Sequence, residues 1–128
     1  MILLLDTSTP GCKLTLIDGD WRYDDEWQAD RTLAKHLLLY LQQQLDKNNK
    51  TFDGIKGIGV FQGPGSFTGL RIGLTVLNTI ADAQCVPIVG ALGETWQQSA
   101  LHRLQSGEND VMVLPFYGSE AHITTPRK

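Results

Sequence analysis

The stretch that decides the fold is GPGSFTGLRIG at residues 63–73, which follows an apolar run at residues 55–62. Two glycines flanking a proline are typical of a tight turn, because glycine adopts positive φ freely and proline fixes its own φ. Residues 67–84 then have the composition of a helix, and Ser66 and Thr68 are candidates for capping its first turn. The stretch therefore predicts a strand, a glycine turn and a packed helix.

The same stretch could in principle hold a phosphate, because the N-terminus of a helix presents free N–H groups. It lacks the Gly-Lys-Ser/Thr ending of a Walker A loop and the GxGxxG spacing of dinucleotide-binding folds. Gly69 and Gly73 lie on one helix face, where each costs about 1 kcal/mol relative to alanine, so close packing is the expected compensation. Geometry alone thus favours a structural turn over an anion site. The candidate loop residues are Asp6, Thr7, Ser8, Gly63, Gly65, Ser66, Thr68, Gly69 and Arg71.

Outward from this stretch, hydrophobic periodicity divides the rest of the chain into further short elements. The opening segments predict antiparallel strands, and the later alternation of helices and strands predicts parallel crossovers. The result is a mixed five-stranded α/β sheet in the order β-β-β-α-β-α-β-α. The expected strands are 2–6, 12–18, 21–27, 55–62 and 86–89; the expected helices are about 30–46, 67–84 and 92–105. Residues 111–116 are a candidate for one more strand.

The predicted helix at residues 30–46 has candidate caps at both ends. Asp30 or Thr32 would cap its start, and Asn48 with Asn49 would end it.

Size and composition limit the classes of function. The 128 residues suit one domain with one core, at 41% hydrophobic and 20% charged residues. The net charge is −3, and the scattered Lys and Arg form no basic patch, which argues against direct RNA binding. No apolar run approaches the roughly 20 residues that span a bilayer. Cys12 and Cys85 have no paired spacing and are expected to be buried thiols. We expect a cytoplasmic protein without membrane contact.

The sequence shows no complete catalytic or metal-binding pattern. His36, His102 and His122 form no HxxxH or HExxH pair, so no metal site is expected. Ser8 and Ser66 lie outside any GxSxG elbow, so peptidase activity is not expected. We therefore assign no catalytic residue to this chain.

GPGSFTGLRIG after an apolar strand, together with LDTST at residues 5–9, resembles the signature of the TsaB (YeaZ) family. The resemblance covers roughly residues 1–100. It implies one lobe of the actin-like, sugar-kinase-like ATPase (ASKHA) fold. It also implies a non-catalytic scaffold subunit that binds TsaD, with TsaE joining as an ATPase, to form N6-threonylcarbamoyladenosine at position 37 of tRNA. ATP and metal would then lie on the partner subunits, with no cofactor in the isolated chain, and tRNA would be met only indirectly.

The two main helices carry surplus apolar residues. The apolar arc of the first helix spans about 160° and that of the second about 200°, whereas a helix on one sheet needs about 100°. Burial of the second helix between the sheet and the first would explain much of the excess. The resemblance instead implies a partner surface, used for TsaD or for a homodimer. The expected surface residues are Leu37, Tyr40, Leu41, Arg71, Thr75 and Asn78.

Ordinary members of the family are longer and carry a second lobe. We therefore expect a single ASKHA-like lobe at residues 1–108 and a C-terminal strand or tail at residues 109–128, with the second lobe absent. Two alternatives remain open. One is a small nucleotide-binding, phosphotransferase-like protein that uses Asp6, Thr7 and the glycine loop, and the other is a self-associating homodimeric domain.

Overall fold

The computed structural model describes residues 1–116 and contains one mixed sheet. Its strands are β1 (Ile2–Asp6), β2 (Gly11–Asp18), β3 (Trp21–Gln28), β4 (Gly57–Phe61) and β5 (Ile88–Ala91). Their order across the sheet is β3-β2-β1-β4-β5. The β1–β2 and β2–β3 pairs are antiparallel, whereas β1–β4 and β4–β5 are parallel. The predicted mixed five-stranded sheet is confirmed.

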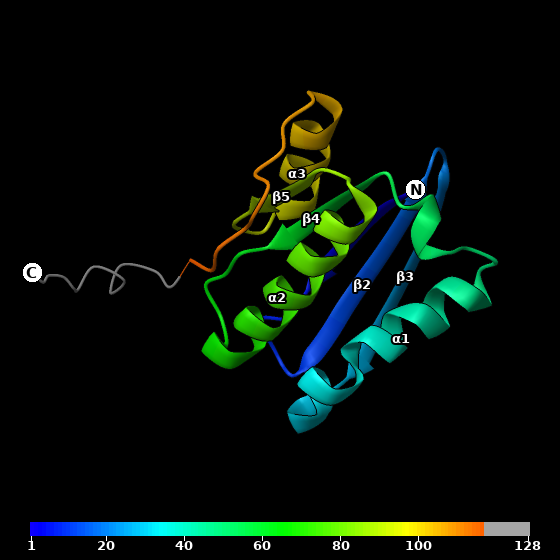
Figure 1. Cartoon of the computed structure of the whole chain (residues 1–128). Helices are drawn as coiled ribbons and strands as arrows, with labels where there is room; N and C mark the ends of the chain where they lie inside the picture. The colour runs from blue at the N-terminus through cyan, green and yellow to red at the C-terminus, as the bar shows by residue number, and fades with distance from the viewer. Residues whose placement is uncertain (117–128) are drawn as a thin grey trace, which may run out of the picture.

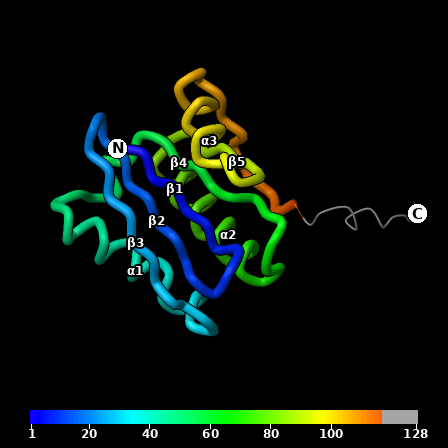
Figure 2. The backbone as a smooth tube through the Cα atoms, turned by 180° about the vertical axis from the view of Figure 1, so that it is seen from behind, coloured from blue at the N-terminus to red at the C-terminus, as the bar shows by residue number. Residues whose placement is uncertain are grey.

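Helices cover the sheet from both sides (Figure 1). One face carries α1 (Leu33–Lys47) and α2 (Phe67–Gln84), and the other carries α3 (Trp96–Gln105). Seen from behind, the sheet lies in front of α1 and α2, and α3 lies near β4 and β5 (Figure 2). Two 3-10 turns, η1 (Asp30–Thr32) and η2 (Phe52–Gly54), flank α1. The predicted order of elements is confirmed.

The central strands are apolar throughout because both faces of the sheet are covered. Leu3 and Leu5 belong to the core under α1 and α2, while Leu4 belongs to the core under α3. All three side chains are fully buried. Successive side chains of a strand point to opposite faces, so a strand between two helical layers is apolar at every position.

The ends of α1 differ in how well the sequence predicted them. Thr32 is the N-cap residue, as one of the two predictions had it, but its side chain does not cap the helix: Thr32 Oγ1 donates backwards to the Ala29 carbonyl at 2.6 Å. Asp30 lies in the preceding 3-10 turn. The predicted end is confirmed. Asn48 is the C-cap, and Asn49 has a φ of 58°, a left-handed conformation that asparagine tolerates.

The fifth strand and the third helix both begin later than predicted. β5 starts at Ile88, because that residue pairs with Ile58 of β4 and the preceding residues complete the turn from α2. α3 starts at Trp96, after a turn in which Gly93 has a φ of 83°. The predicted stop at Ser106 and Gly107 is confirmed, since Ser106 is the C-cap and Gly107 also has a φ of 83°.

Residues 111–116 form no strand, contrary to the sequence-based expectation, and we call them the strap. The side chain of Asn78 on α2 holds the strap by accepting from Val113 N–H at 2.8 Å and donating to the Val113 carbonyl at 2.9 Å. Gln62 donates from Nε2 to the Leu114 carbonyl, and its own carbonyl accepts from Phe116 N–H. The side chains of Asn78 and Gln62, together with the main-chain carbonyl of Gln62, thus take the place of a strand partner. The rest of the predicted tail, residues 117–128, lies outside the described residues.

Two residues before the strap seal the outer edge of β5. Asn109 Oδ1 accepts from Ile88 N–H at 3.1 Å, and Asp110 Oδ2 accepts from Gly90 N–H at 2.9 Å. Arg103 of α3 in turn forms an ion pair with Asp110. The free N–H groups of an edge strand invite pairing with another chain, and here acceptor side chains occupy them.

Because Asp110 takes part in this seal, the stability of the fold depends on pH. Hydrogen bonds from Arg103 hold the pKa of Asp110 below its ordinary 3.8. A carboxyl whose pKa is lower in the folded state stabilises the fold above its unfolded pKa, and that contribution is lost as the pH falls through the folded pKa. We expect Asp110→Asn to lower the free energy of unfolding by about 1–2 kcal/mol at pH 7. In urea denaturation, the difference from wild type should disappear as the pH is lowered below 3.8; a constant difference would contradict the assignment.

Cys85 is exposed, not buried as expected, and it ends α2 in a left-handed conformation with a φ of 57°. Its N–H caps the helix, which is the position where glycine is usually found. Because glycine adopts this conformation without a Cβ penalty, Cys85→Gly is expected to raise the free energy of unfolding by about 0.5–1 kcal/mol. Thermal unfolding under reducing conditions measures this change. Cys85→Ala is the control, because alanine keeps the Cβ atom and therefore its penalty in the left-handed conformation.

Candidate partner surface and the glycine loop

The glycines of the loop let α2 lie directly on the turn that follows β1. A Cβ atom at Gly69 would collide with the carbonyl oxygen of Thr7, and one at Gly73 would collide with the Thr7 side chain. Thr7 Oγ1 donates to the Gly69 carbonyl at 2.7 Å, which fixes the contact. Glycine is therefore present for close approach, and the predicted packing role is confirmed.

The loop itself is closed by local hydrogen bonds. Ser66 is the N-cap of α2, and its Oγ accepts from Gly69 N–H at 3.3 Å, as predicted for one of the two candidates. Ser66 N–H donates to the Ser8 carbonyl at 2.7 Å, which joins the loop to the β1–β2 turn. Thr68 lies inside the helix and is not its cap.

The candidate phosphate residues are brought together only in part. Asp6 accepts from Ser8 N–H at 2.8 Å, so it acts as a turn residue, and Thr7 and Ser8 are buried. Arg71 lies further along α2 on the exposed side, with its guanidinium 5.2 Å from the centre of the Phe67 ring. An open hollow of about 670 Å³ separates the starts of α1 and α2. The side chains of Asp6, Thr7 and Ser66 and the carbonyl of Ser8 are thus engaged in hydrogen bonds within the turn and the loop.

The described residues show little reactive chemistry. Within residues 1–116 there is no cluster of three or more His, Cys, Asp and Glu that could hold a metal ion. In that range no hydrogen bond joins Ser8 or Ser66 to a histidine. Burial raises the pKa of the Cys12 thiol to about 12, so this thiol is neutral. His122 lies outside the described residues.

Three of the predicted surface residues are buried. Leu37 and Leu41 are fully buried under α1, and Tyr40 is 6% exposed. The Tyr40 ring stacks on Trp27 with centroids 4.8 Å apart, and its hydroxyl donates to Asp25 at 2.5 Å. Burial, followed by the contact with Asp25, raises the pKa of Tyr40. These side chains hold α1 on the sheet, so their predicted place on the surface is wrong.

The large exposed apolar side chains of α1 are Leu38 and Leu39, at 54% and 50% exposure. Sequence reasoning missed Leu38, although the run Leu37-Leu38-Leu39 carried the signal. Three consecutive residues of a helix point in directions 100° apart, so a sheet cannot cover all three.

On α2, Arg71 and Thr75 are exposed as predicted, and whether a partner contacts them stays a prediction. Asn78 is half-buried and its side chain is engaged by the strap, and its predicted place in a partner surface likewise stays a prediction.

The exposed side of α2 is a ridge with a groove on each side. The ridge is formed by Arg71, Thr75 and Thr79. The α1–α2 groove contains two hollows of about 400 and 540 Å³. Its lining residues include Ala34, Leu38, Ile72, Val76 and Ala83. On the other side, the strap groove of about 360 Å³ lies between the ridge and the strap.

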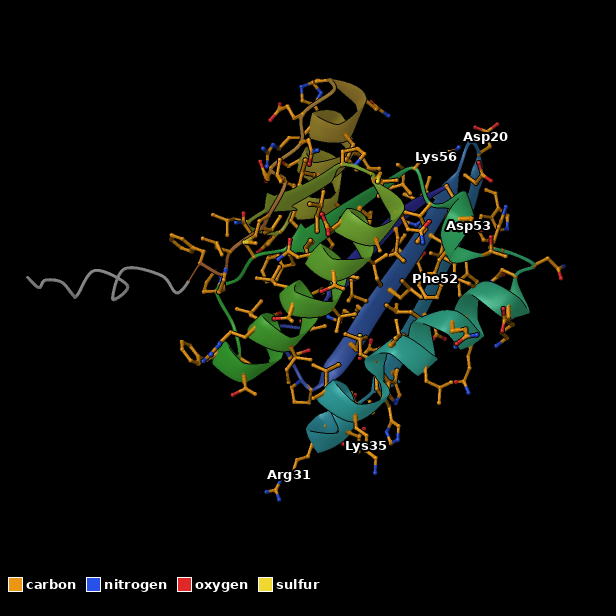
Figure 3. All side chains as sticks on the ribbon, in the orientation of Figure 1. Asp20, Arg31, Lys35, Phe52, Asp53 and Lys56 are labelled. Atoms are coloured by element: carbon orange, nitrogen blue, oxygen red, sulfur yellow. The ribbon has the colours of Figure 1, made fainter. Side chains whose placement is uncertain are left out.

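Charges near the α1–α2 groove are placed against the helix dipoles. Arg31 and Lys35 lie at the start of α1, where Figure 3 shows both pointing away from the body, and Arg71 lies near the start of α2. Asp46 and Asp82 lie near the ends of the two helices. Cations at a helix start and anions at its end are unfavourable by a few tenths of a kcal/mol each, so the folded chain gains nothing from this placement.

The three cations Arg31, Lys35 and Arg71 form no ion pair within residues 1–116. Asp30 beside Arg31 and Lys47 beside Asp46 are exceptions to the pattern at the start and at the end of α1. Cations thus lie near the starts of the two helices and acidic residues near their ends, and of these charged residues Arg71 lines one of the two hollows of the groove. Such a surface is suited to a partner with the opposite order of charges.

None of the helices in the described part of the chain is both long and apolar enough to cross a bilayer.

Comparison with known proteins places this architecture in a family. The family model described as TsaD, tRNA N6-adenosine threonylcarbamoyltransferase, matches residues 27–91. The tRNA threonylcarbamoyladenosine biosynthesis protein TsaB of Haemophilus influenzae is 26% identical over 123 residues, which cover 96% of this chain and 52% of that protein. TsaB of Buchnera aphidicola is 32% identical over 91 residues, covering 71% of this chain and 41% of that protein.

The solved structure of YeaZ from Pseudomonas aeruginosa superposes with a TM-score of 0.69 at 28% identity. The match covers 82% of this chain and 49% of that one, and the chain spans about half the length, or less, of the relatives described here. The glycine loop, the strand order and these matches agree. The chain has a TsaD-type, ASKHA-like fold and belongs to the TsaB (YeaZ) family.

Proposed function

We propose that this chain is a non-catalytic partner subunit in the cytoplasmic formation of threonylcarbamoyladenosine in tRNA. It binds a TsaD-like subunit through the α1–α2 groove, and that subunit, with a TsaE-like ATPase, supplies ATP, metal and the contact with tRNA. The observation that carries the proposal is the apolar groove beside Thr75, walled by the exposed Leu38. The names of the TsaB relatives support the pathway.

A groove between two helices is suited to a helix of the partner. Side-chain ridges of one helix pack into the grooves of another at axis separations of 8–10 Å. The partner should present acidic residues to Arg31, Lys35 and Arg71, because these cations have no ion-pair partner among the described residues.

The binding test uses Leu38→Glu and Thr75→Arg, which place a charge in the apolar groove. Each is expected to weaken the complex with the TsaD-like subunit at least tenfold in titration calorimetry, because an unpaired charge is desolvated at the contact. Leu92→Glu is the matched control, since Leu92 is 43% exposed and lines neither groove. Unchanged affinity for both groove variants would contradict the proposed surface.

The proposed role has its own test. Modification of tRNA is reconstituted from the TsaD-like and TsaE-like subunits with this chain added or withheld. We expect threonylcarbamoyladenosine to accumulate only when the chain is present. Full activity in its absence would overturn the role, whatever the binding measurements show.

A homodimer is a second candidate, which the charge order favours. In a two-fold pairing of antiparallel grooves, the basic end of one copy faces the acidic end of the other. The homodimer and the complex with the TsaD-like subunit would use the same groove, so one excludes the other. Sedimentation with and without the TsaD-like subunit distinguishes them. For the phosphotransferase alternative no such observation exists, since Asp6 and Thr7 are engaged within the loop. Tight binding of ATP and Mg²⁺ by the isolated chain would revive it.

A further inference from the structure

Val111, the first residue of the strap, has a strained backbone. Its φ is 66°, in the left-handed region that a β-branched residue rarely adopts. Met112 N–H donates to the Asp110 carbonyl at 2.7 Å across Val111, so the three residues form the rare γ-turn with positive φ. Such a conformation costs free energy and persists only where the surrounding structure imposes it. The turn must therefore be held by the chain on either side of it.

The chain before this turn is anchored to the outer edge of β5. The outward N–H groups of the strand are satisfied by the seal, which Asn109 and Asp110 form. The outward carbonyls are satisfied as well. That of Ile88 accepts from Asp110 N–H at 2.8 Å, and that of Gly90 accepts from Arg103 Nη1 at 2.8 Å. Because Arg103 also forms an ion pair with Asp110, this anchor combines four backbone partners with a charged contact.

The chain after the turn is anchored by one buried side chain and a few hydrogen bonds. Val113 is 2% exposed and packs into the core, and Asn78 bonds to both of its backbone groups. Gln62 adds two bonds further along the strap. The conformational entropy of fixing the strap and the strain at Val111 oppose these contacts. This anchor is therefore the weaker of the two, and the strain acts to open it.

We propose that the strap is a hinged cover that opens about Val111 while the seal on β5 stays closed. Opening lets Val111 relax to a negative φ, which offsets part of the cost of exposing Val113. The open form uncovers the carboxamide of Asn78 and the apolar site of Val113, and both residues line the same hollow beside the α2 ridge. The closed strap thus withholds a donor, an acceptor and an apolar site from the surface of α2. Opening is a property of the isolated chain and needs no partner.

Native-state hydrogen exchange of the full-length chain, followed by NMR, separates the two anchors. The N–H groups of Val113 and Phe116 report on the strap. Those of Ile88 and Gly90 report on the seal. After correction for intrinsic rates, we expect the strap amides to exchange about tenfold faster than the seal amides, because local opening costs less than loss of the seal. Equal protection at all four amides would overturn the hinge.

Val111→Gly tests the strain. Glycine adopts positive φ without a Cβ penalty but adds freedom to the open strap, so the strap amides should exchange about threefold more slowly. Met112→Gly is the matched control, since Met112 is 62% exposed and its φ lies outside the left-handed region. It adds the same freedom and relieves no strain, so exchange should be unchanged or faster. Faster exchange in Val111→Gly would show that Val111 is not held under strain, and the hinge would fall.

Asn78→Ala tests whether the two anchors are separate. Phe116 N–H bonds to the carbonyl of Gln62 and not to Asn78, so it reports on the strap as a whole. It should exchange about fivefold faster in this variant, because the strap loses its bonds to Asn78. The amides of Ile88 and Gly90 should keep their wild-type rates. A rise of the same size at these two amides would show that the seal opens with the strap, and would overturn the hinge.

Discussion

Gly69→Ala is expected to lower the free energy of unfolding by about 2–4 kcal/mol, although alanine is the better helix former. The added methyl group would meet the carbonyl oxygen of Thr7, which is backbone and cannot rotate away. Either α2 must move off the β1–β2 turn, or the hydrogen bond from Thr7 Oγ1 to the Gly69 carbonyl must break. Urea denaturation followed by circular dichroism measures the change.

Two companion variants show whether the packing at Thr7 is the cause. A Cβ at Gly54 would meet nothing within 4 Å, so Gly54→Ala should change stability little. Gly73→Ala should also destabilise, but its methyl group meets the Thr7 side chain, so Thr7→Ala should relieve the clash. Thr7→Ala should not rescue Gly69→Ala. A gain of about 1 kcal/mol from Gly69→Ala, as helix propensity alone would give, would show that the contact is not tight.

The second large effect is expected at Leu41, where glutamate should lower the free energy of unfolding by more than about 4 kcal/mol. Leu41 is fully buried in the core between α1 and the sheet, so its carboxylate would lose water and gain no partner. Leu38→Glu, three residues earlier but 54% exposed, should change stability by less than about 0.5 kcal/mol. Thermal unfolding of the two variants side by side makes the comparison.

The contrast between these positions decides how partner binding is to be measured. A complex lost with Leu41→Glu would report unfolding, whereas one lost with Leu38→Glu would report the surface. Should Leu41→Glu unfold like wild type while Leu38→Glu unfolds early, the face of α1 on the sheet would be assigned incorrectly.

The sequence predicted the sheet and its helices well because those signals are local or periodic. The bounds of α2 at residues 67 and 84 are confirmed, since a glycine turn and Ser66 define one end. The role of Asn48 and Asn49 at the end of α1 is confirmed for the same reason. Turn chemistry can be read from a few neighbouring residues without knowledge of the rest of the fold.

The candidate site was predicted less well because it depends on tertiary orientation. The apolar arc of α1 is wide enough to leave open which leucines face the sheet, and so Leu37 and Leu41 were placed outside instead of Leu38. The contact between Asn78 and Val113 was not predicted, because the two residues lie 35 positions apart and no sequence pattern links them. The strap resembles a strand by composition, but β5 has its outer N–H groups already satisfied by Asn109 and Asp110.

That sealing of β5 has a consequence for how the molecule behaves at high concentration. A sheet with two open edges can add molecules at both sides and grow into a fibre, whereas a sheet with one open edge stops after a single pairing. Among the described strands, β3 forms the other edge, and it carries Asp24, Asp25 and Glu26. At high protein concentration the chain should therefore pair into dimers and not grow into filaments. Repulsion between the acidic residues of two β3 strands should also weaken the dimer.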